Sequence, residues 1–181
     1  MTRAELAEAI RTRARLEGRF QLRSGLTATE YFDKYRFEGD PALLGAIAGA
    51  LAPLVPASIE MLAGLELGGV PLATALSLHT GLPVVFVRKG AKDYGTRRIA
   101  EGGDIAGRRL LIVEDVVTTG GQVVTSCWDL RALGATVEHA VCVIDRESGG
   151  GQKLHDAALQ LHTLFAMSEL ERFTATQRPE L

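Results

Sequence analysis

An apolar run in the middle of the chain ends in two adjacent acids and then in a Thr/Gly stretch. The run is Leu110–Val113, the acids are Glu114 and Asp115, and the residues that follow are Val116, Val117, Thr118, Thr119, Gly120, Gly121 and Gln122. The pattern predicts a buried strand that passes into a helix. At such a junction free backbone N–H groups and the positive end of the helix dipole converge, and glycines allow close backbone approach. The segment therefore predicts a phosphate cradle.

The acidic pair indicates which class of phosphate compound the cradle could bind. Glu114 and Asp115 would repel an anion unless they face another group, and ribose hydroxyls or a metal ion suit them as partners. The cradle is not a P-loop, because no lysine follows the glycines, and it lacks the G-x-G-x-x-G of dinucleotide sites. The pair thus indicates a sugar phosphate. The alternative interpretation is a solvated turn at a strand end that Asp115 caps.

Basic residues occur at two further places that suit anions. Arg88, Lys89 and Lys92 lie close together in a Gly-rich and charged stretch, where they could clamp a departing pyrophosphate. Arg146 follows a predicted strand, and its planar fork suits a carboxylate. The alternatives are a solvated basic loop in the first case and, in the second, a surface pair between Arg146 and Asp145 or Glu147.

The elements that must position these residues follow from capping signals and apolar periodicity. Thr2 and Glu5 form a capping box that predicts a helix over 3–17, and aromatic residues predict short strands over 20–22 and 31–35. Further helices are predicted over 41–53, 69–80, 121–133 and from 168 onward, and strands over 59–65, 83–88, 110–113, 136–144 and 159–165. Short apolar strands that alternate with helices predict an α/β fold with a mostly parallel sheet covered on both faces.

The stretch 89–107 is too long for an ordinary connection, so we expect a mobile loop that acts as a lid. The length of 181 residues predicts one domain over 1–181, with 1–38 as an N-terminal helix and hood.

The composition excludes several classes of protein. Twenty basic and 22 acidic residues give a formal net charge of −2, which argues against a nucleic-acid surface or an anionic membrane as partner. No apolar run resembles a signal peptide or a transmembrane helix. The two cysteines, Cys127 and Cys142, lack metal-ligand spacing and fit a reducing compartment. We therefore expect a cytoplasmic protein.

The segment 110–121 resembles the signature of the type I phosphoribosyltransferases, which use 5-phosphoribosyl 1-pyrophosphate (PRPP). The resemblance implies that Glu114 and Asp115 contact the ribose 2′ and 3′ hydroxyls and that 116–122 hold the 5′-phosphate. It also implies this family's fold, with a hood and a flexible catalytic loop. Glu114 departs from the family pattern, in which the first acid is often Asp.

Three other segments are similar to those of the orotate phosphoribosyltransferases within that family: 20–25 with 31–35 in the hood, 88–95 in the loop and 143–146 at a strand end. The resemblance implies roles for single residues. Orotate would be bound by Arg23, Thr118 and Arg146; PRPP would also be bound by Arg88, Lys89, Lys92 and Tyr94; and catalysis would involve Lys92, Glu114 and Asp115. It further implies Mg²⁺ held mainly by PRPP rather than by protein side chains alone, and a homodimer in which the loop reaches the neighbouring subunit's site.

Three positions depart from the pattern of many relatives. Arg23 and Gly68 stand where many have lysine, and Tyr94 stands where many have histidine. Because a tyrosine has a reference pKa of about 10, Tyr94 is a poorer proton shuttle than histidine. For the turn Gly64–Gly69 we expect a weaker pyrophosphate contact made by N–H groups, or a simple strand-to-helix turn.

The expected activity is transfer of the phosphoribosyl group from PRPP to orotate, which gives orotidine 5′-monophosphate and pyrophosphate in pyrimidine biosynthesis. One alternative is a phosphoribosyltransferase for another base, which would leave Arg146 without a charged partner. The other is a PRPP-sensing regulator without catalysis, which would need a nucleic-acid surface that the net charge does not favour.

Overall fold

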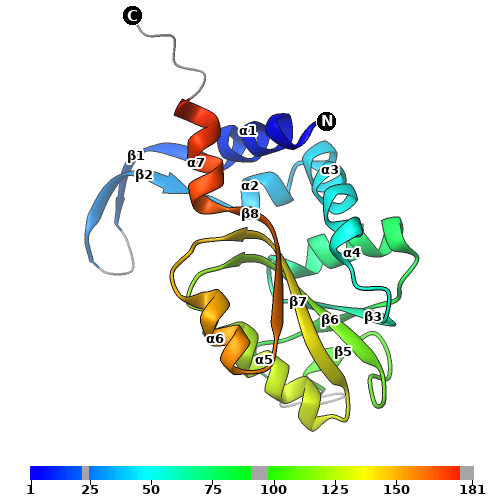
Figure 1. Cartoon of the computed structure of the whole chain (residues 1–181). Coiled ribbons are helices and arrows are strands. Elements are labelled where there is room, and N and C mark those ends of the chain that lie inside the picture. The colour runs from blue at the N-terminus through cyan, green and yellow to red at the C-terminus, as the bar shows by residue number, and fades with distance from the viewer. Residues whose placement is uncertain (22–24, 91–97, 176–181) are drawn as a thin grey trace, which may run out of the picture.

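The computed structural model describes residues 1–21, 25–90 and 98–175. A six-stranded sheet forms its centre, with strand order β5-β4-β3-β6-β7-β8 (Figure 1). The strands are β3 (Met61–Leu65), β4 (Val84–Val87), β5 (Ala100–Glu101), β6 (Arg109–Val117), β7 (Thr136–Asp145) and β8 (Gln160–Ala166). Neighbouring strands are parallel except β5, which runs antiparallel to β4. The expected α/β class with a mostly parallel sheet is confirmed.

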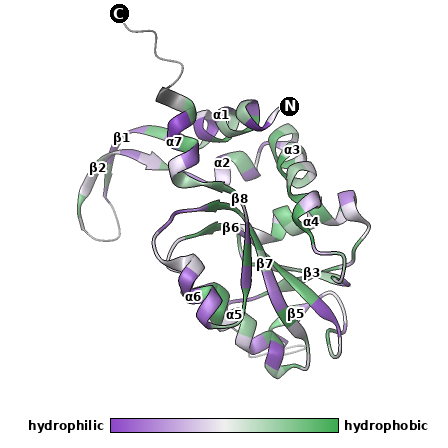
Figure 2. Cartoon of the chain, in the orientation of Figure 1, coloured by the Kyte–Doolittle hydropathy of each residue, from purple (hydrophilic) through white to green (hydrophobic). Residues whose placement is uncertain are grey.

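Helices cover both faces of this sheet (Figure 1). On one face lie α3 (Pro41–Leu51) and α4 (Gly69–Thr80), and on the other lie α5 (Gly121–Ala132) and α6 (Gly150–Asp156). Each face has its own apolar core, because alternate residues of the buried strands point to opposite sides. Figure 2 shows α3 in apolar colour along most of its length, as expected for a helix packed against α4, α1 and the sheet.

The chain reverses its direction of travel across the sheet between β3 and β6. From β3 it passes through α4 to β4 on one side, and from β6 it passes through α5 to β7 on the other. Such a reversal is a topological switch point, where ligands of open α/β sheets bind at the carboxyl ends of the strands. The residues that follow β3 and β6 are therefore the first place to look for a site.

The N-terminal segment differs from its predicted boundaries. Helix α1 spans Arg3–Ala14, not 3–17, because Arg15–Gln21 form strand β1 and pair antiparallel with β2 (Thr27–Phe32). The predicted strand 31–35 is also wrong after Phe32. The Asp33 carboxylate accepts a hydrogen bond from the Tyr35 backbone N–H, and the short helix α2 (Tyr35–Glu38) begins there.

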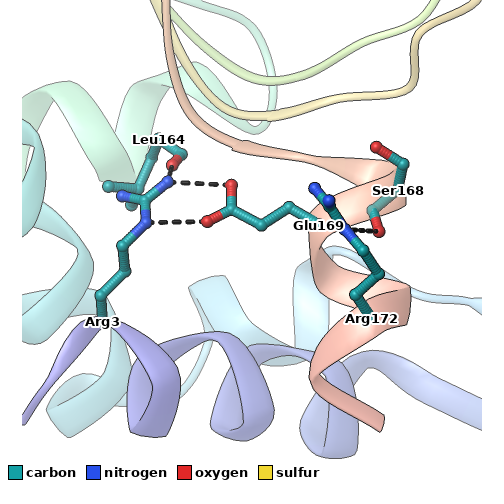
Figure 3. A network of polar contacts seen from close by, with 5 residues as sticks. All are labelled: Arg3, Leu164, Ser168, Glu169 and Arg172. Atoms are coloured by element: carbon teal, nitrogen blue, oxygen red, sulfur yellow. Dashed lines mark hydrogen bonds and ion pairs between the residues drawn. The ribbon is translucent and has the colours of Figure 1, made fainter. Parts of the chain in front are cut away.

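The hood is attached to the other end of the chain through α1 and α7 (Met167–Ala175). Arg3 donates from Nε and Nη2 to the two carboxylate oxygens of Glu169, at 2.8 and 2.9 Å, and Nη2 also donates to the Leu164 carbonyl (Figure 3). The Arg3 guanidinium lies over the Phe165 ring, 4.4 Å from its centroid. Fork-to-fork pairing of this kind fixes orientation as well as distance. It holds α1 against α7 and β8.

Besides α2, the short elements β5 (Ala100–Glu101) and α6 (Gly150–Asp156) were not predicted. Strand β5 has only two residues, and α6 has the sequence GGQKLHD, in which Leu154 supplies the one large apolar side chain. Neither offers enough apolar periodicity for detection. The structure also extends β6 to Val117, so the acidic pair lies inside the strand rather than after it. That 1–181 form one domain stays a prediction. In the described part of the chain no helix is both long and apolar enough to span a membrane.

Candidate active site

Residues from three neighbouring strands meet at the carboxyl edge of the sheet. Parallel register sets Gly64 of β3 beside Val113 of β6, and Val117 of β6 beside Asp145 of β7. The Arg146 backbone N–H donates to the Val117 carbonyl at 2.8 Å, so Arg146 lies beside the Thr/Gly stretch. The helices α4 and α5 begin at the same edge. Each has 12 residues, and their first-turn N–H groups lack intrahelical partners.

The predicted phosphate cradle forms the turn between β6 and α5. Thr118, Thr119 and Gln122 are exposed, whereas Val117 and Gly120 are buried and Val116 and Gly121 are half-buried. Gly120 adopts the left-handed conformation, with φ of 70°, and precedes the first residue of α5. The exposed threonines and the helix N-terminus thus present donors on one surface, as an anion site requires.

Helix α6 packs directly against the phosphate cradle. A Cβ at Gly150 would lie 2.5 Å from the Thr118 carbonyl oxygen, and one at Gly120 would lie 2.5 Å from Leu154 Cδ1. These distances leave no room for a side chain at either glycine. The two backbones therefore pack directly on each other, and α6 fixes the shape of the turn.

The acidic pair belongs to a buried cluster that includes two residues of the N-terminal segment. Asp115 is fully buried, and its Oδ2 lies 2.5 Å from Lys34 Nζ, while its Oδ1 accepts a hydrogen bond from the Val116 N–H. Burial alone would raise the pKa of Asp115, but the Glu114 and Lys34 side chains outweigh burial and lower that pKa. Burial likewise opposes the charge on Lys34, yet Asp115 raises the Lys34 pKa. Asp115 is therefore a carboxylate paired with an ammonium group.

Burial raises the pKa of the other two acids of the cluster. Burial, followed by the neighbouring Asp115 carboxylate, raises the pKa of Glu38 to about 9 and the pKa of Glu114 well above its ordinary value. Glu38 Oε1 is buried without a hydrogen-bond partner among the described residues. Glu38 is therefore protonated near pH 7, and the Asp115 carboxylate is paired with the Lys34 ammonium group.

Gly68 lies directly against the acids of this cluster. A Cβ at this position would lie 1.5 Å from Asp115 Oδ2 and 2.9 Å from Glu38 Oε1. At Gly68 the backbone of the turn after β3 therefore lies next to the acids, with no side chain between them. The Glu66–Leu67 peptide bond in this turn is cis. The predicted pyrophosphate turn lies at the switch point, beside Asp115. Its contact with pyrophosphate stays a prediction.

The predicted basic loop begins beside the same turn. The Arg88 N–H donates to the Ile99 carbonyl, and the Lys89 N–H donates to Glu66 Oε1 at 2.6 Å. Lys89 is exposed, and Arg88 forms a long ion pair of 4.0 Å with Glu101. The structure thus brings the root of the loop to the site. Lys92 and Tyr94 lie outside the described residues, as does Arg23 in the hood.

A cavity of about 340 Å³ opens beside Arg146. Its walls include Arg11 of α1, Arg15 of β1, Tyr31 and Phe32 of β2, and residues of α7. Arg146 is exposed, and the acids beside it have other partners, since Glu147 binds Ser168 and Asp145 binds the Glu147 N–H. The lining of the cavity combines guanidinium groups and aromatic rings with the acids Glu30 and Glu171, and Arg15 is ion-paired with Glu30. The exposed guanidinium group of Arg146 and the aromatic rings suit a planar ligand that carries a negative charge.

Sequence reasoning missed four residues of the two sites: Lys34, Glu38, Arg11 and Arg15. Lys34 and Glu38 interact with Asp115 although they precede it by about 80 positions in the sequence. No local pattern signals a contact of that kind. In the sequence, Glu38 is followed by Gly39 and Asp40, and this pattern predicts a polar turn rather than a site residue.

Comparisons with known proteins show which family the chain resembles. Residues 39–161 match the family model of the phosphoribosyl transferase domain. The chain is 51% identical over 168 residues to the orotate phosphoribosyltransferase of Nocardioides sp., covering 93% of this chain and 94% of the relative. It is 41% identical to that of Methanocella arvoryzae, covering 92% and 95%. The structure of Mycobacterium tuberculosis orotate phosphoribosyltransferase in complex with PRPP superposes with a TM-score of 0.80 at 28% identity, covering 93% and 98%.

The raised pKa of Glu38 predicts a pH-dependent contribution to stability. Because its folded-state pKa of about 9 exceeds the ordinary 4.5, this contribution is complete below pH 4.5 and is lost as the pH rises toward 9. Glu38→Gln keeps the shape of the neutral acid but does not titrate. We expect the melting temperature of the wild type, relative to Glu38→Gln, to fall steadily between pH 5 and 9 in thermal unfolding measurements.

Glu138→Gln controls for the loss of an exposed glutamate, on β7. A difference between wild type and Glu38→Gln that stays constant across this pH range would contradict a protonated Glu38.

Proposed function

The chain belongs to the phosphoribosyltransferase family, and on this premise we propose how its site works. It transfers the 5-phosphoribosyl group from PRPP to orotate, giving orotidine 5′-monophosphate and pyrophosphate, a step of pyrimidine biosynthesis. One observation carries the assignment of the site. The acidic pair and the Thr/Gly cradle lie at the switch point of the sheet, and the backbone of Val117 binds Arg146, which lines a cavity with further arginines and aromatic rings.

The donor binds along the carboxyl edge of β3 and β6. The 5′-phosphate accepts hydrogen bonds from the N–H groups and hydroxyls of 118–122, because these donors are exposed and face the positive end of α5. The ribose hydroxyls contact Glu114 and Asp115. The pyrophosphate lies toward the turn Gly64–Gly69 and the N-terminus of α4, with Arg88 and Lys89 beside it.

The acceptor binds in the cavity beside Arg146. The carboxylate of orotate pairs with a guanidinium group, and the pyrimidine ring packs against Tyr31 and Phe32. A neutral purine or uracil would leave Arg146 without a charged partner, so this residue favours orotate over another base. Thr118 follows Val117, whose carbonyl accepts a hydrogen bond from the Arg146 N–H, and we propose that this threonine contacts orotate as well as the donor.

We propose that Mg²⁺ binds to the protein together with PRPP. Among the described residues no group of three or more His, Cys, Asp or Glu side chains could hold a metal ion. In the buried cluster the Asp115 carboxylate is already paired with Lys34. We propose that Mg²⁺ is held mainly by PRPP oxygens. When bound, the ion would neutralise charge on the pyrophosphate.

The protein's part in the reaction is to position and to stabilise charge. The bond from ribose C1 to pyrophosphate breaks, a bond from C1 to the pyrimidine N1 forms, and the N1 proton is released to the leaving pyrophosphate or to solvent. Positive charge therefore grows on the ribose and negative charge grows on the leaving group. Asp115 holds the ribose while basic residues at the loop root, with Lys92, face the pyrophosphate. Fixed charges of this kind stabilise a transition state without reorganisation.

We further propose a cytoplasmic homodimer with shared active sites. The loop that carries Lys92 leaves the site at Lys89 and returns at Ile99, and it would complete the site of the neighbouring chain. Both cysteines are free and buried, which is compatible with a reducing compartment.

Orotate consumption tests the activity. Pure protein with PRPP and Mg²⁺ should reduce the absorbance of orotate, and Arg146→Gln should raise the KM for orotate by about tenfold or more, since a charge-assisted hydrogen bond is lost. The KM for PRPP should change little. Binding of PRPP without any turnover of orotate would instead favour the regulator.

Mixed dimers test the shared site. Lys92→Ala and Asp115→Asn should each be inactive alone, because one lacks the loop cation and the other the ribose ligand. A 1:1 mixture that has exchanged subunits should recover about a quarter of the wild-type activity, since half of the dimers contain one intact composite site. No recovery in a mixture shown to contain mixed dimers would mean that each site lies within one chain.

A further inference from the structure

Lys34 reaches the ribose-binding acids from a part of the chain that the signature does not include. It directly precedes α2, and its Nζ lies 2.5 Å from Asp115 Oδ2. Its side chain is one-third exposed, at 33%, while the Asp115 side chain is at 0%. The ammonium group of a partly exposed lysine therefore contacts a carboxylate that solvent does not reach.

The geometry around Asp115 leaves it few alternative positions. Gly68 lies beneath Oδ2 so closely that a Cβ would overlap it, and the Val116 N–H binds Oδ1. Glu38 lies against the same glycine. The carboxylate is thus confined between the backbone of the turn after β3 and the ammonium group of Lys34.

The charges that face Asp115 come from two elements. Lys34 and Glu38 belong to the N-terminal segment, and Glu114 precedes Asp115 on β6. Tyr35 lies beside Lys34, with its ring centroid 5.3 Å from Nζ. Of this set, Lys34 is the group that supplies positive charge. Without it, the buried Asp115 carboxylate would lose its ammonium partner, and its pKa would rise.

We infer that Lys34 is a positioning residue for donor binding, which holds the Asp115 carboxylate in place to accept hydrogen bonds from the ribose hydroxyls of PRPP. A neutral Asp115 would present one donor and a weaker acceptor in place of an ionised acceptor. The hood therefore serves the donor half of the site as well as the acceptor half. This inference rests on the proposed function, because it takes PRPP as the ligand.

The test compares Lys34→Met with two variants. Lys34→Arg keeps the charge, and Arg36→Met removes a charge from the exposed side of the same helix. Each protein is assayed for kcat and for the KM of PRPP and orotate between pH 5.5 and 9. PRPP binding without orotate is measured by calorimetry, and melting temperatures show whether each variant is folded.

For Lys34→Met we expect the KM and the dissociation constant of PRPP to rise by about 10-fold to 100-fold, since a buried carboxylate loses its partner. The KM for orotate should stay within about twofold of the wild type. Because the Asp115 pKa rises when the ammonium group is removed, the acid limb of kcat/KM for PRPP should move up by about one pH unit or more. Lys34→Arg should recover part of the loss, and Arg36→Met should match the wild type.

Two results would overturn the inference. One is a Lys34→Met protein with wild-type PRPP affinity and an unshifted acid limb. The other is a folded Lys34→Arg protein that is no better than Lys34→Met, since the charge would then be irrelevant. Failure of the proposed function looks different, because the wild type itself would then bind no PRPP or turn over no orotate.

Discussion

Parallel pairing of β3, β6 and β7 is the constraint on which the rest of the site depends. It sets the ends of three strands at one edge of the sheet, so that the turn after β3, the acidic pair of β6 and Arg146 after β7 become neighbours. It also starts α4 and α5 at that edge on opposite faces of the sheet. Two helix N-termini and the neighbouring strand ends thus create a region in which the backbone alone favours the binding of anions.

An acidic pair at such an edge requires compensation, because buried carboxylates repel both each other and the phosphates of a ligand. The structure provides it with one ammonium group, from Lys34, and with protonation of Glu38, whose pKa is raised to about 9 by burial. Burial also raises the pKa of Glu114, whereas the pKa of Asp115 is lowered, so Asp115 keeps its charge. Close backbone contacts at Gly68, Gly120 and Gly150 then fix the surroundings, since none of these positions has room for a side chain. Electrostatics and packing therefore act on the same few atoms.

The sequence predicted those parts of the fold and site whose signals are local. Helix α4 begins and ends as predicted, because its periodicity is bounded by Gly68 and by the left-handed Gly81. The signature segment was placed correctly at a strand-to-helix junction. The start of β1 was missed because Arg15–Gln21 becomes a strand only through pairing with β2. The roles of Lys34 and Glu38 were missed for a similar reason. Their contact with Asp115 exists only in the folded chain, and α6 was too short and polar to be recognised.

The central claim is that the carboxyl edge of β3 and β6 binds the ribose phosphate of PRPP, and a crystal structure of the protein with PRPP and Mg²⁺ tests it most directly. The account predicts ribose hydroxyls within hydrogen-bond distance of Glu114 and Asp115, with the 5′-phosphate on the N–H groups of 118–122 and Lys34 still paired with Asp115. A ribose bound elsewhere would contradict it. So would an Asp115 that stays enclosed by Lys34 and Gly68 without touching the ligand.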